Sequence, residues 1–427
     1  MFNFKYNIIN FFKITLSFLN MVLMLRLFGI SEGSDIYLLA YSIILSWHFI
    51  PLFFMGQFIQ FYNDLKEDSC GTANNFYNQT LIYSLSIGLI LFLICYIFLN
   101  PLVHLYTHNI NPAKLLSLVQ ILKIMIFSII FAPVVSLTEQ LFIAEKKILH
   151  SYILQIIILL GTVLTMAYLI LVNNPSIKIL AVSYSVSIFI SALYGFLYCA
   201  KRIIPFKFVL TSKNFVKFIR NSFATYFGFG IFNCFFPLVL NNFLVNFSNG
   251  IISCFYYSKN TIEAVNMVTV DYTNRNITSD LSIMIAKKEM DKIKQIIKKY
   301  LIFSPLLFGV VSFSVFIAIP VMLKLVFYKT GFSLNEKMFA NIFLSLVPWY
   351  IIFIISCPFS YINILGKKSY AVIIANSFFV GTTATVLFLS SKELIYNISF
   401  AMFLAQITVF IIYWCYSKKT LINLSKE

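Results

Sequence analysis

The chain has 427 residues, of which 60% are hydrophobic and only 11% are charged, and its mean hydropathy is +0.88. The charged fraction is about half that of a typical soluble domain. Apolar runs of about 20 residues, enough to cross a bilayer as a helix, recur along the whole length. These features exclude a soluble domain and predict an all-α polytopic membrane protein, because a transmembrane β-barrel would show alternating segments of about 10 residues.

The apolar runs predict about twelve membrane-spanning helices. The first run is too long for the apolar region of a cleaved signal peptide, so it is expected to remain as a helix. In chain order the predicted spans lie near residues 8–29, 36–62, 80–100, 115–143, 149–172, 178–200, 218–247, 250–272, 301–327, 339–365, 370–390 and 394–416.

The formal net charge of +17 has two interpretations. Basic surfaces bind nucleic acid, but the cytoplasmic loops of membrane proteins also collect lysine and arginine. When the N-terminus is placed inside, most basic residues fall in inside segments, including Lys146, Lys147, Lys201 and Arg202. The second interpretation is therefore favoured, with both termini in the cytoplasm and no nucleic-acid partner.

The chain also divides into two similar halves of six predicted spans, residues 1–205 and 206–427. One common shift along the sequence aligns Pro101 with Pro320, at the outer end of the third span of each half, and aligns a lysine pair in each half. Internal repeats are typical of secondary transporters, whose substrate site lies between the halves. The pattern predicts two parallel six-helix bundles.

Four basic residues fall inside predicted spans: Lys13, Arg26, Lys123 and Lys259. A cation at the middle of a span costs roughly 2.5–3.5 kcal/mol on insertion scales, so it usually faces a cavity or a partner. Lys13 and Arg26 lie near span ends, where their side chains can also reach the membrane surface. Lys123 and Lys259 lie deeper, and together the four predict a positively charged chamber at the interface of the halves.

The eighth predicted span is the most polar, because tyrosine, serine, asparagine and threonine surround Lys259. A helix this polar cannot face lipid on most sides. One interpretation buries it in the bundle with Lys259 and Glu263 paired at i,i+4; the other makes it a cavity wall, and the two are compatible. The second span, which contains His48, has a similar composition, so these two helices are the predicted lining of the cavity.

Acidic residues in and beside the spans are candidates for coupling and gating. Glu139, Glu263 and Asp271 could bind a proton or sodium ion, and Asp35 could orient Arg26 or close an outer gate. The seven cysteines and four histidines show no metal-ligand spacing, and no phosphate-binding loop or hydrolase motif occurs. The sequence thus predicts no cofactor, no metal and no catalytic activity.

A positive chamber in a split bundle suits an anion with many acceptor atoms, such as a pyrophosphate. A flippase for a lipid-linked sugar must admit such a head group and leave the lipid tail outside. The main alternative is a cation-coupled multidrug exporter of the same fold, which would depend on Glu139, Glu263 or Asp271. A glycosyltransferase or polymerase is a further alternative, but it would usually need a large outside loop, and the predicted outside segments are short.

Several motifs resemble a known family. The stretch RLFGISEGSDIYLLA (residues 26–40), followed by GQFIQ (56–60), resembles the N-terminal signature of the MviN/MurJ lipid II flippases of the MOP exporter superfamily. The segments FSNGIISCFYYS (247–258), FYKTGFS (327–333) and GKK (366–368) are also similar to family positions. The resemblance implies a V-shaped, MATE-like architecture of two bundles, a central cationic cavity and alternating access.

The same resemblance implies the site and the substrate. Arg26, Lys123, Lys259 and, less strongly, Lys13 would contact the pyrophosphate of an undecaprenyl-linked oligosaccharide in a bacterial inner membrane. His48 stands near an expected arginine of the family, and Ser258-Lys259-Asn260 replaces an Ala-Asp-Arg sequence, so His48 and Asn260 join the predicted substrate-binding set. These differences favour an O-antigen or capsule unit as cargo over lipid II.

Overall fold

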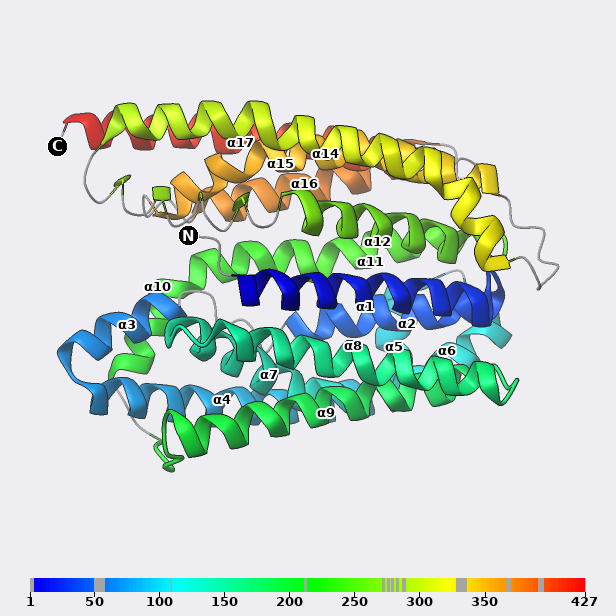
Figure 1. Ribbon diagram of the computed structural model, residues 1–427, viewed down its shortest axis with the longest axis horizontal. Helices are drawn as coiled ribbons and strands as arrows, with labels where there is room; N and C mark the ends of the chain where they lie inside the picture. The colour runs from blue at the N-terminus through cyan, green and yellow to red at the C-terminus, as the bar shows by residue number, and fades with distance from the viewer. Residues whose placement is uncertain are drawn as a thin grey trace. The chain divides into compact units, whose positions relative to one another are not determined.

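The computed structural model describes residues 4–49, 58–108, 110–210, 213–270, 273–274, 277, 280–281, 284–285, 289–327, 336–365, 370–390 and 395–426. Throughout these ranges the regular secondary structure is helical (Figure 1), which confirms the predicted all-α class. The chain forms two compact units, Met1–Tyr226 and Phe227–Glu427. The boundary predicted from the sequence, between residues 205 and 206, lies earlier in the chain.

The N-terminal unit is a bundle of long helices joined by short turns. Its helix pairs α1 and α8, α8 and α9, α7 and α9, and α4 and α7 pack against one another, whereas α2 packs on α6 (Figure 1). The helices are α1 (Phe4–Phe28), α2 (Glu32–Phe49), α3 (Phe58–Asp68), α4 (Cys70–Ile97), α5 (Leu99–Tyr106), α6 (Pro112–Met125), α7 (Ser128–Ala144), α8 (Ile148–Leu171), α9 (Ile177–Arg202) and α10 (Lys213–Gly230).

The C-terminal unit begins with the last residues of α10, from Phe227, which continue through a π-helical turn, η2 (Ile231–Phe235), into α11. In this unit α15 packs on α12, α14 and α17, and α16 packs on α17 and η2. The remaining helices are α11 (Phe236–Leu244), α12 (Ile251–Thr269), α14 (Met290–Phe327), α15 (Glu336–Leu365), α16 (Tyr370–Leu389) and α17 (Tyr396–Lys426).

Nine helices within the described residues are long and apolar enough to cross a membrane, or ten when α6 and α7, which meet at an angle of 48°, are counted as one bent span. Helices α2 and α12 are not among them. They correspond to the second and eighth predicted spans, which are the spans rich in polar residues. The prediction of a membrane protein is confirmed, whereas the number of twelve spans stays a prediction.

The turn between α1 and α2 is fixed by its own side chains. Gly29 adopts a positive φ of 60° and ends α1 with a hydrogen bond from its N–H to the carbonyl of Leu25 at 2.8 Å. Ser31 and Ser34 then cap α2 reciprocally, because the Ser31 N–H donates to Ser34 Oγ at 3.0 Å and the Ser34 N–H donates to Ser31 Oγ at 3.4 Å. The cap places Asp35 in the first turn of α2, where a helix favours negative charge.

The segment that follows α9 is fastened along α4. Asn78 Nδ2 donates to the carbonyl of Pro205 at 3.2 Å, and Gln79 Nε2 and the Tyr83 hydroxyl donate to the carbonyl of Leu210 at 3.1 and 2.9 Å. Asn78 and Gln79 are buried, at 1% and 2% exposure. Residues 204–210 therefore belong structurally to the N-terminal unit.

Candidate functional site

The polar helix α12 presents one buried face and one half-exposed face. Gly250, whose φ of 90° favours glycine, precedes its first turn. On the buried face Ser258 Oγ donates to the carbonyl of Phe339 on α15 at 3.2 Å, and the Tyr256 hydroxyl donates to Asn241 Oδ1 on α11 at 2.6 Å. These bonds fix the rotation of α12 within the C-terminal unit.

The half-exposed face of α12 carries the charges. Lys259 Nζ lies 2.6 Å from Glu263 Oε1, with 22% of the lysine side chain and 36% of the glutamate side chain exposed. Asn260 beside them is also half-buried. The predicted i,i+4 pairing is confirmed. Because hydrogen bonds on the buried face fix the rotation of α12, the position of this pair is fixed as well. The Lys259 ammonium group has three N–H donors and can bind an anion there.

The predicted site residues on α1 and α6 have three different surroundings. Lys13 is half-buried, and its Nζ lies 5.8 Å from the centre of the Tyr152 ring on α8, a cation–π contact. Arg26, in the last turn of α1, and Lys123, on α6, are exposed. The three belong to the N-terminal unit, whereas Lys259, Asn260 and Glu263 belong to the C-terminal unit.

His48 lies inside the N-terminal unit. Its side chain is 7% exposed, its Nε2 is 2.6 Å from Ser128 Oγ on α7, and its ring stacks on Tyr184 of α9 at 6.4 Å between centroids. A substrate that reached His48 would have to replace the Ser128 contact. The sequence placed His48 on a polar helix but contained no signal for its partners, which lie far along the chain.

The predicted coupling and gating acids are dispersed. Asp35 is 1% exposed in the first turn of α2, and Glu139 on α7 accepts a hydrogen bond from Gln155 Nε2 on α8 at 2.5 Å. Asp271 lies outside the described residues, as do residues 56–57, 328–333 and 366–368 of the family-like motifs. Among the residues whose structure is described, no group of three histidine, cysteine, aspartate or glutamate side chains could hold a metal ion.

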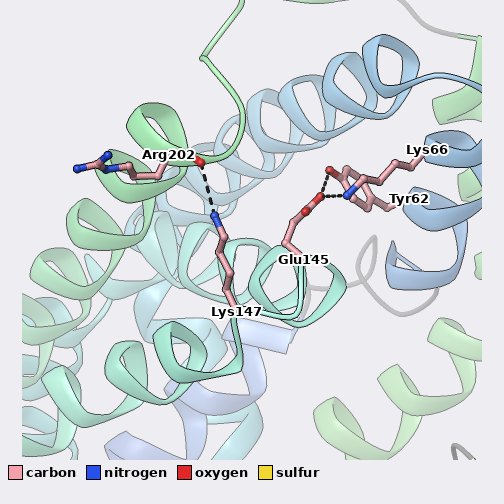
Figure 2. A network of polar contacts seen from close by, with 5 residues as sticks. All are labelled: Tyr62, Lys66, Glu145, Lys147 and Arg202. Atoms are coloured by element: carbon pink, nitrogen blue, oxygen red, sulfur yellow. Dashed lines mark hydrogen bonds and ion pairs between the residues drawn. The ribbon is translucent and has the colours of Figure 1, made fainter.

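A polar network at the ends of α3, α7 and α9 was missed by the sequence analysis (Figure 2). Glu145, the residue after α7, accepts hydrogen bonds from Lys66 Nζ and from the Tyr62 hydroxyl, both at 2.7 Å. Next to it, Lys147 Nζ donates to the carbonyl of Arg202 at 3.5 Å. The sequence showed Lys147 as a topological signal but could not reveal Glu145 as the acceptor, because Lys66 lies 79 residues away.

The surroundings of Glu145 favour the ionised form of its carboxyl group. Burial alone raises the pKa of Glu145, but the hydrogen bonds from Lys66 and Tyr62 and the charges of Lys66 and Lys147 outweigh burial, so the pKa lies below its ordinary value. A carboxylate whose pKa is lowered by folding stabilises the protein above its ordinary pKa, and that contribution is lost as the pH falls through the lowered pKa.

We therefore expect Glu145→Gln to destabilise the protein by about 1–2 kcal/mol near neutral pH, the size of a hydrogen-bonded ion pair that is partly open to water. Thermal unfolding in detergent measures this. The difference from wild type should shrink as the pH falls below the ordinary pKa of a glutamate, and it should vanish once the pH lies below the lowered pKa of Glu145. The matched control is Glu289→Gln, which breaks a more exposed pair with Lys292 at 3.1 Å and should change stability by less than about 0.5 kcal/mol. A pH-independent difference would contradict the assignment.

Comparison with known proteins gives a family and a fold. Residues 24–427 match the family described as Lipid II flippase MurJ. Among curated proteins, no match to the sequence was found. A structure of the lipid II flippase MurJ in an inward closed conformation aligns with a TM-score of 0.78 and 15% identity, covering 99% of this chain and 90% of that one.

Two other transporters share the fold. An inward-facing multidrug resistance MATE family transporter of the MOP superfamily aligns with a TM-score of 0.74 and 12% identity, over 97% of this chain and 96% of that one. A MOP superfamily transporter from Pyrococcus furiosus aligns with a TM-score of 0.69 and 12% identity, over 98% and 94%. The helical bundles described above are thus those of MurJ and MATE transporters, and the match over nearly the whole sequence decides between them: the chain belongs to the lipid II flippase MurJ family.

Proposed function

We propose that the protein flips an undecaprenyl-pyrophosphate-linked oligosaccharide across the bacterial inner membrane by alternating access, with both termini in the cytoplasm. Membership of the MurJ family supports the class of transport, and the bias of basic residues supports the orientation. The cargo would be lipid II itself or another polyprenyl-linked unit of the O-antigen or capsule kind.

The observation that carries the proposal is the position of Lys259 on α12. A membrane-embedded cation is costly unless it has a partner, and Glu263 supplies one at 2.6 Å while using a single N–H donor of the ammonium group. Phosphate oxygens are strong acceptors for such a group. Lys259 and Asn260 would bind the pyrophosphate, and Arg26, Lys123, Lys13 and His48 are the further proposed contacts.

Transport of a defined cargo tests the function directly. The wild-type chain in proteoliposomes should move fluorescent undecaprenyl-pyrophosphate sugars between leaflets, and a comparison of lipid II with other polyprenyl-linked sugars would name the cargo. Empty liposomes and liposomes that contain an unrelated membrane protein are the controls. Absence of movement for every polyprenyl-linked sugar would refute the proposal.

The alternative is a cation-coupled multidrug exporter. The fold shared with MATE transporters and the half-buried acid Glu139, hydrogen-bonded to Gln155, favour it. Under this alternative the same proteoliposomes would export a cationic dye when a proton or sodium gradient is imposed, and Glu139→Gln would abolish that export. The number of in-span bases favours the flippase, since positive charges repel a cationic drug.

A further inference from the structure

A cavity of about 210 Å³ opens beside the polar network of Figure 2. It lies entirely within the N-terminal unit, apart from every residue assigned above to transport. We refer to it as the headgroup pocket. Its polar lining comes from Tyr62, Lys66, Asn74, Glu145, Lys147 and Arg202.

The charge of the headgroup pocket is positive. Lys66, Lys147 and Arg202 line it, against the single carboxylate of Glu145. Figure 2 shows Lys66 and Lys147 on either side of Glu145, with the guanidinium of Arg202 directed away from them. An anion in the pocket would therefore meet the two lysines first, with Arg202 at the rim.

Two helix N-termini add to the positive electrostatic potential of the headgroup pocket. Cys70 and Asn74 lie in the first two turns of α4, and Lys147 is the N-cap residue of α8 and makes no side-chain cap hydrogen bond. Both helices are long, with 28 and 24 residues, and a helix N-terminus attracts anions such as phosphate. The C-terminal ends of α7 and α9 also lie here, and their backbone is partly capped by the N–H groups of Lys147 and Ile204.

The ammonium group of Lys147 makes two weak contacts within the protein. Its Nζ is 3.5 Å from the Arg202 carbonyl and 5.6 Å from the centre of the Tyr198 ring. The first contact is a long hydrogen bond and the second is a cation–π contact, so both position the ammonium group weakly. A phosphate oxygen would form a shorter, charge-assisted bond from the same position.

The size and the border of the pocket indicate the kind of phosphate. Pockets for drug-sized ligands usually measure about 300–1,000 Å³, so 210 Å³ suits a phosphate with a short polar substituent rather than an oligosaccharide. Ile203 on the wall leads directly into the fastened segment 204–210, where Phe206 and Phe208 are 45% and 71% exposed. Aromatic side chains beside basic residues are typical of the membrane–water interface.

We propose that the headgroup pocket binds the phosphate of an anionic phospholipid, with Lys147 and Lys66 as its main contacts. Basic pockets between transmembrane helices hold lipid headgroups in this way. The acyl chains would leave past the exposed aromatic residues of segment 204–210. This site is independent of the proposed transport function and can be tested without any transport assay.

Cys70 gives a local probe, because it is exposed and lines the pocket, whereas Cys415, the other exposed cysteine, does not line it. The full chain is incorporated in phosphatidylcholine nanodiscs with increasing phosphatidylglycerol, and the alkylation rate of each cysteine is followed by peptide mass spectrometry. Phosphatidylglycerol should slow alkylation of Cys70 several-fold and leave Cys415 unchanged. Inorganic phosphate at millimolar concentration should protect neither.

Variants should shift the phosphatidylglycerol fraction that gives half-protection in opposite directions. Lys147→Gln should raise this fraction about fivefold, and Glu145→Gln should lower it by a similar factor. The reason is that one elementary charge near the membrane surface changes the affinity for an anionic lipid by about fivefold. Lys147→Arg should behave as wild type. The matched control is Lys178→Gln, which removes the same charge at the other end of α9, about 36 Å from Arg202 along the helix, and should have no effect.

Four results would overturn the proposal. Equal slowing of Cys70 and Cys415, or an equal effect of Lys178→Gln and Lys147→Gln, would show a general surface charge instead of a site. Protection of Cys70 in pure phosphatidylcholine would remove the requirement for an anionic headgroup. Protection by inorganic phosphate alone would assign the pocket to a soluble phosphate and refute the lipid.

Discussion

Replacement of Lys259 with methionine should lower the flipping rate of a polyprenyl-pyrophosphate sugar by about 10- to 100-fold. A hydrogen bond from a charged group to a phosphate contributes about 1.5–3 kcal/mol, and each 1.4 kcal/mol corresponds to a factor of ten. Methionine keeps the length and apolar character of the lysine stem, so the packing of α12 against α14 and α15 should be preserved. The measurement is flipping in proteoliposomes, normalised to folded protein.

Two matched variants separate binding from helix stability. Glu263→Gln also breaks the 2.6 Å pair on α12, but it leaves the ammonium group in place and should lower flipping less than threefold. Lys292→Met breaks an exposed lysine–glutamate pair at the start of α14 at 3.1 Å and should change nothing. If Glu263→Gln were as damaging as Lys259→Met, the pair would serve α12 itself, and Lys259 would lose its proposed role in binding.

The glycine at position 228 should tolerate no side chain, and Gly228→Ala is expected to destabilise the C-terminal unit by about 1–3 kcal/mol. A Cβ there would lie 2.8 Å from the backbone nitrogen of Ile373 and 2.9 Å from the carbonyl carbon of Val372 on α16. Backbone atoms cannot rotate away, so the helices would have to separate. Separation would also strain the hydrogen bond from Asn376 Nδ2 to the Gly228 carbonyl, at 3.0 Å. Close helix contacts through small residues are a main source of packing in membranes.

Gly381→Ala on the same α16 is the control, because no atom lies within 4 Å of the added Cβ. It should be neutral or should stabilise the helix by about 0.5–1 kcal/mol, the usual gain for alanine over glycine. Thermal unfolding of both variants in detergent gives the comparison. Equal stability of Gly228→Ala and Gly381→Ala would contradict the close approach of Gly228 to α16.

The sequence predicted the helices well because membrane spans depend on local composition. A run of about 20 apolar residues must be helical in a bilayer, whatever its neighbours are. The polar character of the second and eighth spans was also visible in the sequence, and the corresponding helices, α2 and α12, are not among those long and apolar enough to cross a membrane. The predicted fourth span proved to be two helices, α6 and α7, that meet at an angle of 48°. The sequence did not indicate this bend, because the turn between them contains no proline or glycine.

The surroundings of the site residues could be predicted only where both partners share a helix. Lys259 and Glu263 are four residues apart, so their pairing followed from the periodicity of a helix. His48 and Ser128 are 80 residues apart, and their contact depends on how α2 and α7 pack. Glu145 lies at the end of a predicted span and carried no sequence signal. A partner on another helix depends on rotation and depth, which hydropathy does not encode.

The fastening of residues 204–210 to α4 determines what a reporter group on this segment would measure. A fluorophore or spin label at Phe206 or Phe208 would move together with the N-terminal unit, since Asn78, Gln79 and Tyr83 bind the backbone on both sides of it. Signals from these positions would report on the tumbling and lipid contacts of that unit. A label intended to report on the second unit therefore belongs beyond Tyr226, where that unit begins.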